Sequence, residues 1–212
     1  MKWRTYALYF LILVYVSGSI GFAYNPSFFL PFTPFTLLFT CFVFLCYQPL
    51  KNKTFILAFA GIALIGFISE VIGVKTGLVF GNYYYGNTLG IKLLGVPLTI
   101  SINWALLATA SILVSTYVFK NKWMIAASSS FIATSIDFLI EQLAPRLDFW
   151  YFSGGMAGMH NYIGWFLVSF VAALLFQSYL KGGDKKISLI ILGLQLLFFG
   201  VIYFINFKNL IQ

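Results

Sequence analysis

Three of the five acidic residues, Glu70, Asp137 and Glu141, lie inside long apolar stretches of the sequence. An ionisable side chain at membrane depth is costly, so each is a candidate functional group. Asp137 and Glu141 are four residues apart, which places them on one face of a helix, about 6 Å apart along its axis. Carboxyl groups that lie close together in an apolar site cannot all ionise, so at least one should keep its proton near neutral pH. We therefore predict that these three residues form a catalytic acid/base set.

Other polar side chains fall at the same expected depth. Asn103 and Trp104 lie about ten residues into the next apolar stretch, and His160 and Asn161 begin a later one. If successive helices alternate in direction, all of these groups come to the same half of the bundle as the three acids. A single polar residue of this kind is explained by hydrogen bonding between helices. Their common depth favours a shared pocket, in which these four side chains bind the substrate.

Membrane-spanning helices must position these residues. Hydrophobic residues make up 61% of the chain and charged residues only 8%, whereas soluble domains have about 25% charged residues. Apolar stretches of roughly 20 residues, enough to cross a bilayer core of about 30 Å, occupy residues 3–23, 30–50, 54–73, 93–119, 123–143, 161–180 and 187–206. We predict an all-α fold, a polytopic integral membrane bundle of about seven helices that forms a single domain over residues 1–212.

The basic residues indicate an orientation rather than a nucleic-acid partner. If the N-terminus is cytoplasmic, nine basic residues fall on the cytoplasmic side: Lys2, Arg4, Lys51, Lys53, Lys120, Lys122, Lys181, Lys185 and Lys186. Four fall outside: Lys75, Lys92, Arg146 and Lys208. The positive-inside rule favours this arrangement in the cell membrane, with the C-terminus outside. The first span has no clear cleavage site, and we expect it to be retained.

Two connections, residues 74–92 and 144–160, are aromatic and glycine-rich rather than charged. They contain Tyr83 and Tyr85 in the first, and Asp148 and Trp150 in the second. Such segments either lie in the membrane interface or fold back to cap a cavity. An interfacial aromatic belt is equally consistent with the pattern. Under the second interpretation, these four residues bind the substrate above the acids.

Several chemistries lack their usual motifs. The chain has one histidine and no paired-histidine zinc motif, and it has no nucleophile elbow, phosphate loop or dinucleotide fingerprint. The last span contains no lysine that a retinal Schiff base would require. We therefore expect neither a metal nor a cofactor. The remaining possibility is proton transfer to a lipophilic molecule that enters from the bilayer. Aromatic residues make up 20% of the chain, and the faces of their rings could stabilise a carbocation.

Two blocks carry a more specific pattern. From Glu70 to Trp104 the chain reads E-x-x-G-x-x-T-G-x-x-F-G-x-Y-x-Y, then G-V-P and W. From Asp137 to Trp165 it reads D-x-x-x-E-x-x-A-P-x-x-D-F-W, then N-Y-I-G-W. Together the blocks cover about 65 residues, and they resemble the carotenoid biosynthesis membrane proteins, a family that includes the carotenoid 1,2-hydratases and the bisanhydrobacterioruberin hydratases.

The resemblance implies that water is added across the terminal 1,2 double bond of an acyclic carotenoid end group, without a redox cofactor or metal. The acids that match its pattern are Glu70, Asp137, Glu141 and Asp148, and Asn161 and Trp165 match in the second block. The implied partners are a carotenoid that arrives from the bilayer, membrane lipids and other enzymes of carotenoid biosynthesis.

Two other functions stay open. A lycopene-cyclase-like enzyme would protonate the same end group and close a ring. A transporter or lipid-binding protein would use the carboxyls as a proton relay. The sequence does not decide the exact carotenoid, the oligomeric state or which carboxyl is the acid.

Overall fold

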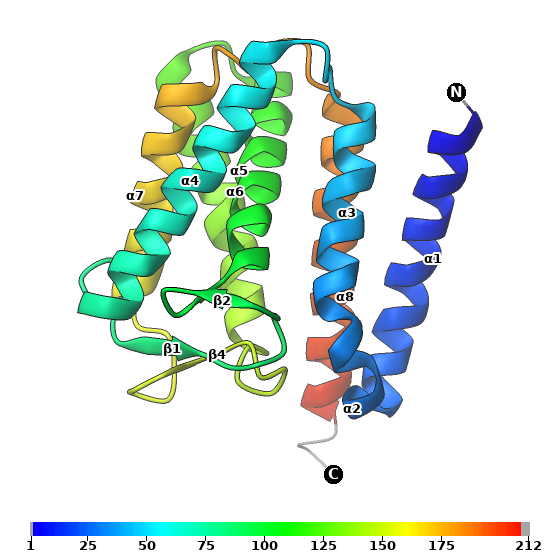
Figure 1. The fold of residues 1–212 in the computed structure, drawn as a ribbon, viewed down its shortest axis with the longest axis vertical. Coiled ribbons are helices and arrows are strands. Elements are labelled where there is room, and N and C mark those ends of the chain that lie inside the picture. The colour runs from blue at the N-terminus through cyan, green and yellow to red at the C-terminus, as the bar shows by residue number, and fades with distance from the viewer. Residues whose placement is uncertain (1, 209–212) are drawn as a thin grey trace.

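The protein is described here by a computed structural model over residues 2–208. Seven of its helices are long and apolar enough to cross a membrane, which confirms the predicted all-α bundle (Figure 1). Six of these spans are single helices: α1 (Lys2–Tyr24), α4 (Lys53–Thr76), α5 (Leu98–Val118), α6 (Lys122–Glu141), α7 (Met159–Phe176) and α8 (Lys185–Lys208). The remaining span, Pro26–Tyr47, joins the short α2 (Pro26–Phe29), the 3-10 turn η1 (Leu30–Phe32) and α3 (Thr33–Tyr47).

Helix α5 is the centre of the bundle. It packs against α3, α4, α6, α7 and α8, and 72% of its spanning segment is buried, compared with 22% for α1. Small side chains such as Ala105, Ala108 and Ser111 allow neighbouring helices to approach closely, which is how membrane helices gain packing energy. In Figure 1, α4 to α7 form one group, and α1, α3 and α8 stand beside it.

The fourth span is shorter than its apolar stretch predicts. Residues 93–119 are predicted to be helical, but α5 begins only at Leu98. The preceding residues form a small hairpin in which β2 (Lys92–Leu93) pairs with β3 (Val96–Pro97). The turn places Gly95 at φ 90°, a conformation that glycine adopts without a steric penalty. Asn103 and Trp104 therefore lie nearer the end of α5 than expected.

The two aromatic connections pair with each other, although the sequence analysis predicts no strand. β1 (Tyr83–Tyr85) and β4 (Trp150–Phe152) form an antiparallel ribbon at one end of the bundle (Figure 1). Side chains alternate across a strand, so Tyr83 and Tyr85 are buried while Tyr84 is 59% exposed. We call this β1–β4 pair the ribbon, and it closes the end of the bundle where the acids lie.

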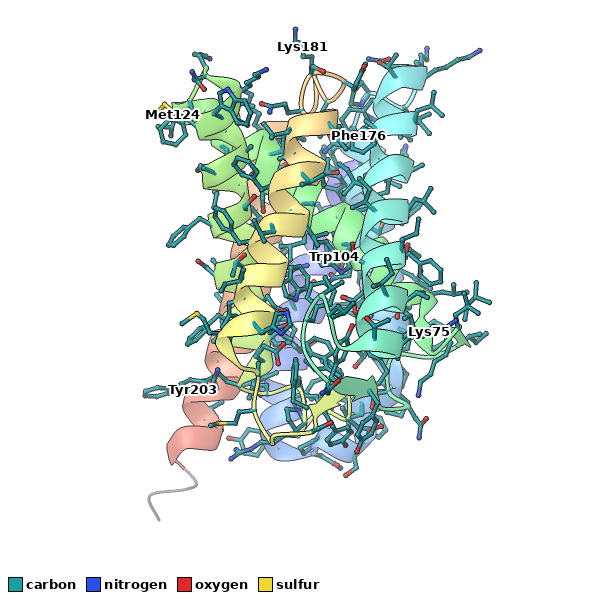
Figure 2. The ribbon with its side chains drawn as sticks, turned by 90° about the vertical axis from the view of Figure 1, so that its left-hand side faces the viewer. Lys75, Trp104, Met124, Phe176, Lys181 and Tyr203 are labelled. Atoms are coloured by element: carbon teal, nitrogen blue, oxygen red, sulfur yellow. The ribbon has the colours of Figure 1, made fainter. Side chains whose placement is uncertain are left out.

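The opposite end of the bundle has short connections. Asn52 and Asn121 cap the first turns of α4 and α6 by accepting backbone hydrogen bonds. Lys181 lies at this end, whereas Lys75 lies at the ribbon end (Figure 2).

Candidate functional site

A small cavity lies beneath the ribbon and between α4, α5, α6 and α7; we call it the acid cavity. Its volume is about 20 Å³, which is enough for one water molecule. Its lining residues are Glu70, Phe80, Tyr83, Tyr85, Ile100, Asn103, Trp104, Asp137, Ile140, Glu141, Trp150, Phe152, Asn161 and Trp165. None of them is a lysine or arginine, so the three carboxyls share the cavity without a cationic side chain in its described lining.

Glu70 is held by three donors. Its Oε1 atom accepts a hydrogen bond of 2.9 Å from the Trp104 indole, and its Oε2 atom accepts one of 2.6 Å from the Tyr85 hydroxyl and a short one from the Tyr83 hydroxyl. Only 3% of Glu70 is exposed, and these donors offset the cost of removing the carboxyl from water. Burial and the neighbouring Glu70 raise the pKa of both tyrosines, so both phenols stay protonated as donors.

A second group joins the other two acids. The Asn161 amide nitrogen donates to Asp137 Oδ2 at 3.1 Å and to Glu141 Oε1 at 2.9 Å. The Trp150 indole donates to Glu141 Oε2 at 2.9 Å. Asp137 and Glu141 lie one turn apart on α6, so a single amide from α7 can hold both carboxyls in place.

One carboxyl oxygen differs from the rest. Asp137 Oδ1 is buried and has no hydrogen-bond partner among the described residues. Every other oxygen of the three acids accepts a hydrogen bond. A buried polar atom without a hydrogen-bond partner requires an explanation, and a role in catalysis is one of those known in proteins. Asp137 Oδ1 is therefore the oxygen that is free to meet a substrate.

Aromatic rings enclose the carboxyls. Trp104 and Trp165 stack with their centroids 3.8 Å apart and their planes at 8°. The ring centroid of Phe80 lies 6.1 Å from that of Trp104 and 6.2 Å from that of Tyr83. The ring centroids of Tyr83 and Phe152 are 5.3 Å apart. Such rings attract positive charge through their faces. The cavity thus combines proton-transfer groups with an environment that stabilises a cation.

Two glycines make this packing possible. A Cβ atom on Gly66 of α4 would overlap Trp104, and one on Gly164 of α7 would overlap the backbone carbonyl of Val79. Both helices therefore approach their neighbours at positions where a side chain does not fit.

The structure brings together all three predicted catalytic residues and most of the predicted binding residues. The cavity is lined by the predicted Asn103, Trp104, Tyr83, Tyr85, Trp150, Asn161 and Trp165. The remaining two predicted residues, Asp148 and His160, are not among its lining residues.

Asp148 holds the loop that follows β1. Its carboxyl accepts hydrogen bonds from the Asn87 backbone at 2.8 Å and from the Tyr151 hydroxyl at 2.9 Å. Burial acts to raise the pKa of Asp148, but these bonds and those from Thr88 outweigh it and lower the pKa below its ordinary value. Asp148 thus stabilises the ribbon and does not line the acid cavity.

His160 is exposed and lies at the start of α7. Its ring nitrogen Nε2 lies 2.8 Å from the carbonyl oxygen of Leu78. It links α7 to the segment after α4 and does not line the acid cavity.

Four further lining residues, Phe80, Ile100, Ile140 and Phe152, were not predicted. Ile140 lies three residues after Asp137, so helical spacing places it on the same face and could have identified it. Phe152 faces the site because β4 pairs with β1, a long-range contact that no local pattern predicts.

Comparisons with known proteins show which family this chain resembles. The family model described as carotenoid biosynthesis protein matches residues 32–212. Bisanhydrobacterioruberin hydratase from Haloarcula japonica is 31% identical over 164 residues, which are 70% of this chain and 55% of the relative. The chain therefore spans about half the length of that relative. No solved structure matches the chain. Every lining residue of the acid cavity lies within the segment that the family model covers.

Proposed function

Since the chain belongs to the carotenoid biosynthesis protein family, we propose that its acid cavity hydrates the terminal 1,2 double bond of an acyclic carotenoid end group. The observation that carries this proposal is the arrangement of Asp137, Asn161 and Glu141. The Asn161 amide donates hydrogen bonds to both carboxyls, in a cavity that is lined by aromatic rings and has room for a water. The similar protein from Haloarcula japonica has the name of a hydratase, which supports the same class of reaction.

The first step is protonation of the alkene. Asp137, in its neutral form, donates the proton from Oδ1, which has no partner among the described residues, to carbon C2. The C1–C2 π electrons form the new C–H bond, and the positive charge develops at C1. Two methyl groups and the chain substitute C1, so the cation is tertiary, and Asp137 is left as a carboxylate. A positioned acid contributes about 10²–10⁴-fold to such a step.

The rings of the cavity stabilise the cation. The stacked pair Trp104 and Trp165, with Phe80 beside it, presents π electron density without a nucleophilic atom that would trap the cation. The preorganised carboxylates add a negative potential that acts more strongly away from bulk water.

Water then captures the cation. An oxygen lone pair forms the C1–O bond, and the oxonium loses one proton to a carboxylate of the Asp137–Glu141 pair. The product is a tertiary alcohol with one added hydrogen at C2, so that one water is consumed and the pair regains the proton it gave. Glu141, fixed by Asn161 and Trp150, is placed to orient this water.

Glu70 has a positioning role in this mechanism. Both of its oxygens are occupied by donors from β1 and α5. It fixes the Tyr83 and Tyr85 hydroxyls and the orientation of Trp104, and so shapes the wall against which the cation forms.

The test is an isotope experiment with the purified protein in detergent or liposomes and an acyclic carotenoid. In deuterated water, the product should carry one deuterium at C2. In oxygen-18 water, the label should appear in the new hydroxyl. A cyclase would take up deuterium without oxygen label, and that result, or an unchanged carotenoid, would overturn the proposal.

A further inference from the structure

A second, larger cavity lies next to the acid cavity. Its volume is about 450 Å³, which is within the range of ligand pockets. It is formed mainly by α1, the α2–α3 segment and α8, and it reaches the centre of the bundle at α5 and α6. Ile100, Asn103, Ile140 and Trp150 line both cavities. The two spaces therefore meet at these four side chains.

The walls of the larger cavity are almost entirely apolar. Aromatic side chains dominate and include Phe10, Phe22, Phe29, Phe39, Phe198 and Phe199. None of its described lining residues is charged. A cavity of this composition favours a hydrocarbon, because a strongly polar ligand would lose its hydration and gain only the few polar partners among its lining residues.

This cavity also reaches the membrane-facing surface. Phe10 on α1 and Phe35 on α3 line it and are nevertheless 56% and 70% exposed. Phe32, at the end of η1, lines it as well and is 51% exposed. In a membrane, these rings meet lipid tails on one side and the cavity on the other. A hydrocarbon chain can therefore pass between α1 and α3 without crossing water.

We propose that this larger cavity, the chain cavity, binds the acyclic isoprenoid chain of the substrate behind the end group that reacts at the acid cavity. The inference rests on the proposed function and names the subsite for the rest of the molecule. The end group lies at the four shared residues, where the chain cavity meets the acid cavity and its space for a water. The adjoining chain fills the space among α1, α3 and α8, and the remainder extends between Phe10 and Phe35 into the bilayer.

The junction supplies a specificity element. Asn103 is half-buried and is a polar side chain that lines both cavities. An amide at the boundary can hydrogen-bond the hydroxyl that forms at C1. A substrate whose end group is already cyclic would have to fit a bulkier ring against Ile100 and Ile140, so the junction selects acyclic ends.

Filling the chain cavity tests the inference. Thr36→Trp on α3 and Val14→Trp on α1 each enlarge a side chain at a lining position. The matched controls are Leu38→Trp and Val16→Trp, on the same helices at positions 43% and 42% exposed and outside the cavity lining. Each variant is expressed in a carotenoid-producing host, purified at equal yield, and assayed for bound carotenoid by absorbance and for hydration.

We expect both filling variants to lose bound carotenoid and to hydrate a full-length carotenoid at least about tenfold more slowly, with the controls unchanged. A short acyclic isoprenoid with the same end group should still be hydrated by the filling variants at the wild-type rate, which also shows that they are folded. If both filling variants bind carotenoid and hydrate the full-length carotenoid as well as the wild type does, the proposed role of the chain cavity is wrong.

A different result would contradict the proposed function and leave the chain cavity standing. If the wild type and Asp137→Asn both bind carotenoid and the filling variants do not, but the wild type adds no water, the chain cavity stands and the hydratase mechanism is wrong.

Discussion

Tyr85 and Trp150 lie opposite each other in the ribbon, with ring centroids 6.0 Å apart, and each donates a hydrogen bond to a different buried acid. The Tyr85 hydroxyl donates to Glu70 at 2.6 Å, and the Trp150 indole donates to Glu141 at 2.9 Å. One cross-strand pair outside the helices thus positions carboxyls on two different helices, α4 and α6. The site depends on the ribbon as much as on the spans.

Trp150→Phe should uncouple the ribbon from Glu141. The change removes the indole donor and leaves Glu141 Oε2 without that partner, which costs about 1–3 kcal/mol for a buried acceptor. We expect a lower midpoint of thermal unfolding in detergent and at least about tenfold slower hydration. Trp123→Phe, at a position 54% exposed at the other end of the bundle, is the control, and equal losses in both variants would contradict the role of the Trp150 indole.

Asp137→Asn should abolish most of the activity while leaving the fold intact. The amide keeps the size of the side chain but has no proton that it can transfer, so we expect a loss of about 10²-fold or more in hydration rate. Glu141→Gln should be similarly damaging. Asp184→Asn is the matched control, because Asp184 caps α8 through the Ile187 backbone and asparagine caps equally well. A normal rate in Asp137→Asn, Glu141→Gln and Glu70→Gln together would show that the site is wrong.

Gly66→Ala should displace Trp104. The added methyl would overlap the Trp104 side chain, which donates to Glu70 and stacks on Trp165. In a helix, alanine is normally better than glycine by about 1 kcal/mol, so a loss of stability here reports the clash. We expect lower activity, a lower unfolding midpoint and a change in near-ultraviolet circular dichroism from the tryptophan stack.

Gly193→Ala on α8 is the control for this substitution. A Cβ atom at Gly193 meets nothing within 4 Å, so this variant should be at least as stable as the wild type. A Gly66→Ala protein that resembles Gly193→Ala in both measurements would refute the close approach.

The loop after β1 should loosen in acid. The pKa of Asp148 is lowered from its ordinary value of 3.8 by hydrogen bonds from Asn87, Tyr151 and Thr88, which outweigh the opposing effect of burial. Its stabilising contribution is therefore fully present above that ordinary value and is lost as the pH falls through the lower folded value. Measured relative to the intrinsic exchange rate at each pH, the protection of the amides of residues 82–90 from hydrogen exchange should fall below about pH 4.

Asp148→Asn removes the titrating group and provides the comparison. Its loop should exchange faster than the wild type at neutral pH and show a weaker acid dependence. An identical acid response in the two proteins would assign the effect to another group.

The orientation in the membrane is tested by labelling single cysteines in a background without Cys41 and Cys46. The basic asymmetry predicts that Asn121, between α5 and α6, faces the cytoplasm, and that Asn87, beside the ribbon, faces outward. An impermeant thiol reagent added from outside should label the Asn87→Cys protein and leave the Asn121→Cys protein unlabelled. The reverse pattern would invert the topology.

The spans and the three acids could be predicted from sequence because both rest on local rules. Apolar length identifies a spanning helix, and the cost of a charge in lipid identifies Glu70, Asp137 and Glu141 as residues that need partners. The four-residue spacing of Asp137 and Glu141 also predicts their shared helix face correctly.

The ribbon and the chain cavity depend on contacts between distant segments. Tyr83 and Phe152 pair across β1 and β4. The aromatic residues of both strands favour β structure, but three residues are too few to show an alternating pattern or to indicate which segment each strand pairs with. Asp148 and His160 have the residue types of a catalytic site and stabilise loops instead, since side-chain direction follows from backbone conformations, such as the φ of 51° at Asp148, that composition does not reveal.

The Asn161 amide belongs to a helix that is synthesised after both acids it joins. While the chain is being made, α6 emerges with Asp137 and Glu141 before Trp150 and Asn161 have been added. Two carboxyls without these donors are costly in lipid, so the ribbon end of α6 has to stay near water or the insertion machinery until α7 arrives. Maturation of the site is therefore a late event in the biogenesis of the protein, and a chain that stops short of residue 161 leaves its most polar span without the partners that make it stable in a bilayer.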